Sequence, residues 1–190
     1  MKSRVNTLKS AFEKKKLDGY LVADETNILY FTGFLGAVRL LIPKEGENIL
    51  YVYRLNYEEA KQTVKNCRVE SVKRGESATQ KIVDQIKSLK LKQVGFDVID
   101  ASAYLKLTKA LKGVKLKVQD KLVWALRRVK DETELKHMRK AAELTSEGMK
   151  TALETIKPGL REYEVAAEVE YAMRRRGSEG VAFDTIVASG

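Results

Sequence analysis

The sequence predicts a mixed α/β domain with a mostly parallel sheet flanked by helices, followed by the opening helices of a second, incomplete domain. Three observations lead to this prediction. Up to Gln119, short apolar runs of strand length alternate with segments of helical periodicity. Two of these runs, at residues 37–42 and 49–53, are separated by a turn containing Pro43 and Gly46, which indicates an inserted hairpin. After residue 130, longer helical segments replace the alternation.

Each element of the first domain has a local cause in the sequence. Val5, Leu8 and Phe12 recur at helical spacing among lysines and predict an amphipathic first helix. Ser77 is a suitable N-cap for a later helix, because its hydroxyl can accept a backbone N–H at the helix start. The remaining strands are predicted at residues 20–23, 68–72, 93–96 and 115–118, and the remaining helices at residues 24–34, 55–64 and 101–111.

The second domain begins with a capping signal. Asp131 followed by Glu134 is typical of a helix N-terminus in which each side chain accepts a backbone N–H of the other. A Pro-Gly pair at residues 158–159 ends this helix, and three arginines at residues 174–176 suit the negative C-terminal end of the next. We therefore predict a first domain at residues 1–125 and a second at residues 126–190.

Composition and charge exclude several classes of protein. Apolar residues make up 44% of the 190 residues, which is enough for a sizeable core, and no apolar run is long enough to span a bilayer. The chain starts without a signal peptide and has one cysteine, so we expect a cytoplasmic protein with no membrane partner. The formal charge of +10 makes nucleic acid a possible partner, but the lysines interleave with glutamates, so a solvated, charge-rich surface is favoured over nucleic-acid binding.

No set of residues in the chain matches a catalytic or metal-binding pattern. His137 is the only histidine, and it lies off the apolar stripe of its helix, which indicates a solvated surface residue. Cys67 has no histidine near it in sequence, and the glycines match no phosphate-binding fingerprint. The sequence therefore assigns no catalytic residue, no metal ligand and no cofactor to this chain.

Several stretches nevertheless resemble one enzyme family. The segment at residues 128–141 resembles the linker and first helix of the prolidase, aminopeptidase P and creatinase family, with the Xaa-Pro dipeptidases as the nearest match. The segments at residues 161–170 and 180–190 are similar to those that lead into the catalytic site of this family. The tail, residues 161–170 and 180–190, is the most specific part. The early residues that also resemble the N-terminal domain of this family are Asp24, Asn27, Tyr30, Thr32, Gly33 and Phe34.

The resemblance implies a two-domain subunit that acts as a homodimer. The first domain would be the creatinase/prolidase N-terminal domain, and the second the start of an α+β pita-bread domain that binds two divalent metals, manganese or cobalt. In the family, the metal ligands and catalytic histidines follow the position of Gly190. We therefore expect the parent protein to hydrolyse the peptide bond before a proline in a dipeptide or peptide, and the 190-residue chain to be inactive alone. The alternative is a non-enzymatic dimerisation or protein-binding module of the same fold.

Two residues are candidates for substrate binding through the same resemblance. Phe183 corresponds to an aromatic residue that lines the substrate pocket, and the alternative is core packing beside Val181 and Ile186. Arg39 could reach the active site of a partner subunit, and the alternative is an exposed charge on an edge strand.

The apolar stripes of the second domain lack a predicted partner. We expect Met149, Leu153, Val169 and Met173 to be exposed, and residues after Lys130 to associate with another chain or to be poorly ordered.

Overall fold

The computed structural model describes residues 4–189 in two compact units, one ending at Val129 and one beginning at Lys130. The sequence-predicted boundary after residue 125 falls inside helix α7 (Asp120–Arg128). Val123 of this helix is fully buried in the core of the first unit, so α7 belongs to that unit. No helix in the described part of the chain is both long and apolar enough to cross a bilayer.

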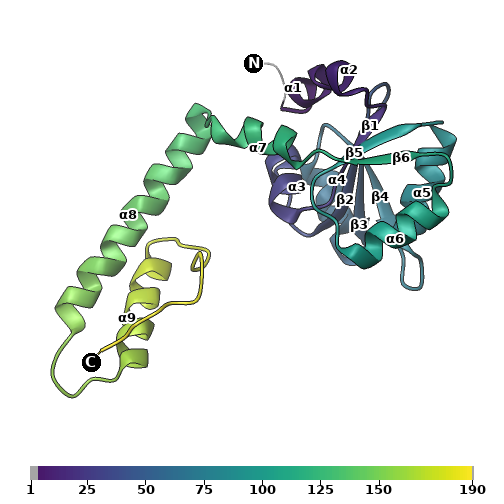
Figure 1. Ribbon diagram of the computed structural model, residues 1–190. Coiled ribbons are helices and arrows are strands. Elements are labelled where there is room, and N and C mark those ends of the chain that lie inside the picture. Colours follow the sequence, from purple (N-terminus) through teal and green to yellow (C-terminus); the bar gives the residue numbers. More distant parts are fainter. Residues whose placement is uncertain (1–3, 190) are drawn as a thin grey trace. The chain divides into compact units, whose positions relative to one another are not determined.

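The first unit is built on a six-stranded mixed sheet with the strand order β4-β3-β2-β1-β5-β6 (Figure 1). Strand β2 runs antiparallel to both of its neighbours, and the other five strands run parallel to one another. This confirms the predicted mostly parallel sheet with an inserted hairpin, β2–β3. The strands are β1 (Gly19–Val22), β2 (Ala37–Pro43), β3 (Ile49–Tyr53), β4 (Arg68–Val72), β5 (Gln93–Phe96) and β6 (Lys115–Val118).

Helices cover both faces of the sheet, because successive strand residues point to opposite sides. One core lies between the sheet and helices α1, α2, α3, α4 and α7, and includes Phe12, Tyr20 and Leu50. The other lies under helices α5 and α6, and includes Leu21 and Val94. The helices of this unit are α1 (Arg4–Ser10), α2 (Phe12–Lys15), α3 (Glu25–Thr32), the 3₁₀ turn Arg54–Asn56, α4 (Tyr57–Thr63), α5 (Ala78–Ser88), α6 (Ala101–Ala110) and α7.

Local signals explain where several helices start and stop. The Ser77 side chain accepts the Gln80 N–H, which confirms its prediction as the N-cap of α5. Asp24 caps α3 in the same way, and Gly33 ends it in a left-handed conformation with φ of 72°. The predicted first helix differs, because the chain bends at Ala11 and forms α1 and α2 instead of one continuous helix.

The second unit is a pair of helices, α8 (Glu132–Thr155) and α9 (Glu162–Arg175), followed by a segment without regular structure. The predicted capping box is present: Asp131 accepts the Glu134 N–H at 2.9 Å, and Glu134 accepts the Asp131 N–H at 3.0 Å. The two helices pack at Gly148, the only residue of α8 that is fully buried. A Cβ at position 148 would lie 3.0 Å from the Met173 sulfur, so the absent side chain permits the close approach.

This packing corrects part of the predicted exposure. Met149 and Leu153 are 63% and 74% exposed, in line with the prediction. Val169 and Met173 are half-buried instead, because their side chains pack against Gly148 of α8. The helix pair thus buries one face internally, although most of the large apolar side chains of α8 stay exposed.

A bulky residue at position 148 should separate the two helices. We expect Gly148→Leu to cost about 1–3 kcal/mol of stability in the second unit, since Met173 and Val169 cannot both move away without losing contacts. Amide hydrogen exchange across α9 measures the effect. Gly180→Leu is the matched control, because no residue other than its two chain neighbours comes within 4 Å of a Cβ at this position. Equal exchange in both variants would contradict this packing.

Candidate functional site

Arg39 lies on an interior strand. It belongs to β2, between β1 and β3, next to an irregularity of register between Ala37 and Arg39. The side chain is half-buried, and its Nη1 donates a hydrogen bond to the Val38 carbonyl at 2.6 Å. The alternative explanation of an exposed edge-strand charge is therefore wrong, since strand order places β2 inside the sheet. A substrate-binding role for Arg39 stays a prediction.

Phe183 lies in the irregular segment after α9, and its ring is 75% exposed. Hydrogen bonds on both sides of Phe183 link this segment to α9. Arg174 donates to the Glu179 carbonyl at 3.4 Å, Thr185 Oγ1 donates to Glu170 at 2.6 Å, and the Ser189 N–H donates to Glu162 at 2.7 Å. Ile186 is 82% exposed, so the alternative of core packing beside Val181 and Ile186 is not what the structure shows. The segment is held by polar contacts while its apolar side chains remain available to a ligand or partner.

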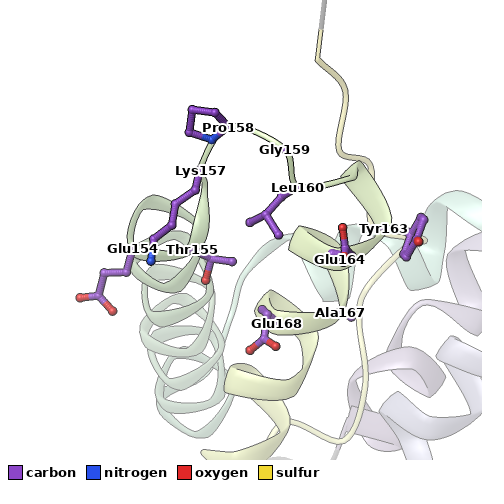
Figure 2. A pocket seen from close by; sticks show the side chains of 10 residues that line it. All are labelled: Glu154, Thr155, Lys157, Pro158, Gly159, Leu160, Tyr163, Glu164, Ala167 and Glu168. Atoms are coloured by element: carbon purple, nitrogen blue, oxygen red, sulfur yellow. The ribbon is translucent and has the colours of Figure 1, made fainter.

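The turn between α8 and α9 forms an open groove of about 850 Å³, shown in Figure 2. Three carboxylates line it, but Glu164 already accepts the Arg161 N–H at 2.7 Å as part of the α9 cap. The aromatic ring of Tyr163 is 63% exposed at this turn. The groove therefore offers open polar surface and no converging set of catalytic groups. It is lined by Glu154, Thr155, Lys157, Pro158, Gly159, Leu160, Tyr163, Glu164, Ala167 and Glu168.

The titratable groups considered from the sequence do not form a reactive site. Among residues 4–189, no three His, Cys, Asp or Glu side chains lie close enough to hold a metal ion. His137 is exposed on α8, as predicted. Burial raises the pKa of the Cys67 thiol to about 12, so the thiol is protonated and a poor nucleophile at neutral pH. These residues do not fit a two-metal centre, and we assign no catalytic step to them.

A buried polar cluster in the first unit was missed from the sequence. Asp97 directly follows β5 and is only 3% exposed. Its Oδ1 accepts the N–H groups of Ala23 and Val98, both at 2.8 Å. Its Oδ2 accepts the Asp24 N–H at 3.2 Å and the Asn27 side-chain amide at 2.9 Å. Four donors thus satisfy a carboxylate that would otherwise be costly to bury.

Helix α7 joins this cluster through Arg127. The Arg127 Nη1 donates to the Asn27 side-chain oxygen at 2.8 Å, so Asn27 bridges the carboxylate and the guanidinium. Tyr20 adds a second link, because its hydroxyl donates to the Gln119 carbonyl at 3.0 Å just before α7. The cluster is internally satisfied, which indicates a positioning role for α3 and α7. Two of its residues, Asp24 and Asn27, were named above among the family-like residues, but no sequence pattern indicated that they meet Asp97.

Comparisons with known proteins identify both parts of the chain. Residues 4–129 match the Creatinase/Prolidase N-terminal domain, and residues 136–190 match Metallopeptidase family M24. The Xaa-Pro dipeptidase of Pyrococcus horikoshii is 34% identical over 193 residues, which covers 100% of this chain and 53% of that protein.

Solved structures of similar proteins have the same fold. The prolidase of Pyrococcus furiosus superposes with a TM-score of 0.88 at 29% identity, covering 98% of this chain and 57% of that one. An Xaa-Pro dipeptidase from Bacillus anthracis gives a TM-score of 0.86 at 26% identity, covering 95% of this chain and 50% of that one. The chain spans about half the length of these relatives. It therefore belongs to the creatinase/prolidase family, with a Creatinase/Prolidase N-terminal domain followed by a segment of the M24 metallopeptidase domain.

Proposed function

We propose that this chain is the N-terminal part of a metal-dependent Xaa-Pro dipeptidase, which hydrolyses the peptide bond before a proline. The observation that carries the proposal is the match of nearly the whole chain to Xaa-Pro dipeptidases over about half of their length. Two divalent cations, manganese or cobalt, would supply an activated water and polarise the scissile carbonyl in the parent protein. Their ligands would come from outside residues 4–189, in which no fitting cluster is found.

Within this proposal, the role of the chain is to build and position one wall of the substrate site. A proline ring is apolar and conformationally fixed, so a pocket for it needs an apolar surface of matching shape. The exposed ring of Phe183 can supply part of that surface. The two hydrogen bonds from Thr185 and Ser189 to α9 limit the positions that the ring can take.

The first unit would contribute through a homodimer in the cytoplasm. Arg39 is a single cationic side chain at an irregular position of β2, and its guanidinium could bind a carboxylate of a proline-containing substrate in the partner subunit. A non-enzymatic protein-binding module is the second candidate. It is supported by the exposed apolar side chains of α8 and the residue after it, Met149, Leu153 and Ile156, which offer a partner a surface to cover.

Hydrolysis by the product of the complete coding sequence tests the dipeptidase proposal. We expect that product, supplied with manganese or cobalt, to cleave Leu-Pro and to leave Pro-Leu intact. Phe183→Ala should lower kcat/KM for Leu-Pro by roughly 10-fold or more, as expected when one apolar wall of a pocket is lost. Ile186→Ala is the control, since this neighbour is similarly exposed. Absence of cleavage would favour the binding module, and equal losses in both variants would remove the role of Phe183.

A further inference from the structure

Lysines from four separate segments gather around the edge strand β6, a feature that the peptidase proposal does not use. The set, called here the lysine edge, comprises Lys14, Lys15, Lys16, Lys90, Lys92, Lys112, Lys115 and Lys117.

Backbone pairing and side-chain contacts bring these segments together. Strand β6 pairs in parallel only with β5, and the Lys115 N–H donates to the Lys92 carbonyl at 2.7 Å. The Lys117 ammonium donates to the carbonyls of Lys15 and Lys16 at 3.1 and 3.2 Å. The end of α2, the turn after α5 and β6 therefore lie side by side, and the turn that contains Lys112 leads directly into β6.

The lysine edge is charged and not neutralised. Seven of its side chains are exposed, and Lys117 is half-buried. None of the eight ammonium groups belongs to an ion pair among residues 4–189. Two acidic residues lie close to these lysines in sequence. Glu13 lies on the same short helix as Lys14 but forms no ion pair with it. The Asp18 carboxylate is occupied by the backbone N–H groups of Lys92 and Gln93 at 2.9 and 2.8 Å.

Sequence composition reinforces the imbalance. Residues 101–119, which form α6 and β6, contain five lysines and no aspartate or glutamate. The sequence favoured an evenly solvated surface because lysine and glutamate interleave along most of the chain. The fold instead assembles one region where the positive charges have few acidic neighbours.

The pattern of the lysine edge favours a duplex polyanion over a membrane or a single strand. Of the apolar residues next to these lysines, Leu17, Leu91 and Leu111 are buried and Leu116 is half-buried. Val118 at the end of β6 is exposed, but it is a single side chain, so this edge has few apolar groups to insert into a lipid surface. No aromatic residue occurs in its four lysine segments, so it lacks a platform for stacking unpaired bases. Ammonium groups spread along an edge suit evenly spaced phosphates.

We infer that the lysine edge binds the phosphate backbone of double-stranded nucleic acid, independently of base sequence. The inference does not depend on peptidase activity, because every residue of the lysine edge belongs to the first unit and none to the M24 segment.

Fluorescence anisotropy of a labelled mixed-sequence DNA duplex with the complete 190-residue chain tests the inference. For about five phosphate contacts, affinity should fall on the order of several hundredfold between about 50 and about 200 mM salt. Lys92→Glu/Lys115→Glu should weaken binding at low salt by at least about tenfold. Lys61→Glu/Lys65→Glu makes the same change in net charge on and just after α4, which lies beside the opposite edge strand β4, and should weaken binding by no more than about threefold.

Three results would overturn the inference. They are no binding at low salt, equal losses in the two double variants, and tighter binding to vesicles of anionic phospholipid than to the duplex. Far-UV circular dichroism verifies that the variants are folded. If the first variant unfolds, Lys90→Glu/Lys112→Glu replaces it, since both side chains are exposed in turns outside the strands.

Discussion

Asp97→Ala is expected to lower the free energy of unfolding of the first unit by about 3–5 kcal/mol, because it leaves several buried donors without an acceptor. The N–H groups of Ala23 and Asp24 and the amide of Asn27 all lose their partner. The loss also removes the support for Arg127, so α7 should become less protected. Urea unfolding followed by the fluorescence of Trp124, the single tryptophan and a residue of α7, measures the change.

Asp100→Ala is the matched control for this variant. Asp100 is an exposed N-cap of α6, and its side chain accepts one hydrogen bond, from the Ala103 N–H at 2.9 Å. Its loss should cost about 1 kcal/mol, the usual value for a helix cap. Similar costs for the two substitutions would show that the Asp97 cluster contributes no more than a surface cap does.

Phe12→Ala should also destabilise the first unit by about 3–5 kcal/mol, since it removes a large buried ring. Phe12 is 0% exposed and stacks on Tyr20, with ring centroids 6.5 Å apart. Phe183→Ala makes the same chemical change at a ring that is 75% exposed, and should alter stability by no more than about 0.5 kcal/mol. Thermal unfolding followed by circular dichroism compares the two. A comparable loss in Phe183→Ala would mean that its ring is packed in the folded chain.

Most element types could be predicted because they depend on local pattern. Alternation of apolar runs and helical periods predicted the strands, and Ser77, Asp131 and Glu134 marked helix starts through hydrogen bonds that span three residues. The order of the strands in the sheet could not be predicted in this way. Whether β2 is an edge or an interior strand depends on pairing with β1 and β3, which the residues of β2 do not encode by themselves.

Long-range contacts account for the other features that were missed. Asp97 and Asn27 are 70 residues apart in sequence, and Arg127 and Asn27 are 100 residues apart. No local sequence pattern therefore predicts the cluster. Gly148 and Met173 pack together only after the chain reverses between α8 and α9. Phe183 and Arg39 were predicted from family resemblance alone, because their own chemistry, an exposed ring and a half-buried cation, fits many roles.

Metal binding by the 190-residue chain tests most directly the claim that these residues form a scaffold whose metal ligands lie elsewhere. We predict that titration with manganese or cobalt, followed by calorimetry and by metal analysis after gel filtration, finds no stoichiometric binding. No three potential ligands converge anywhere in residues 4–189, and the single histidine is exposed on α8. One or two tightly bound metal ions per chain would contradict the claim.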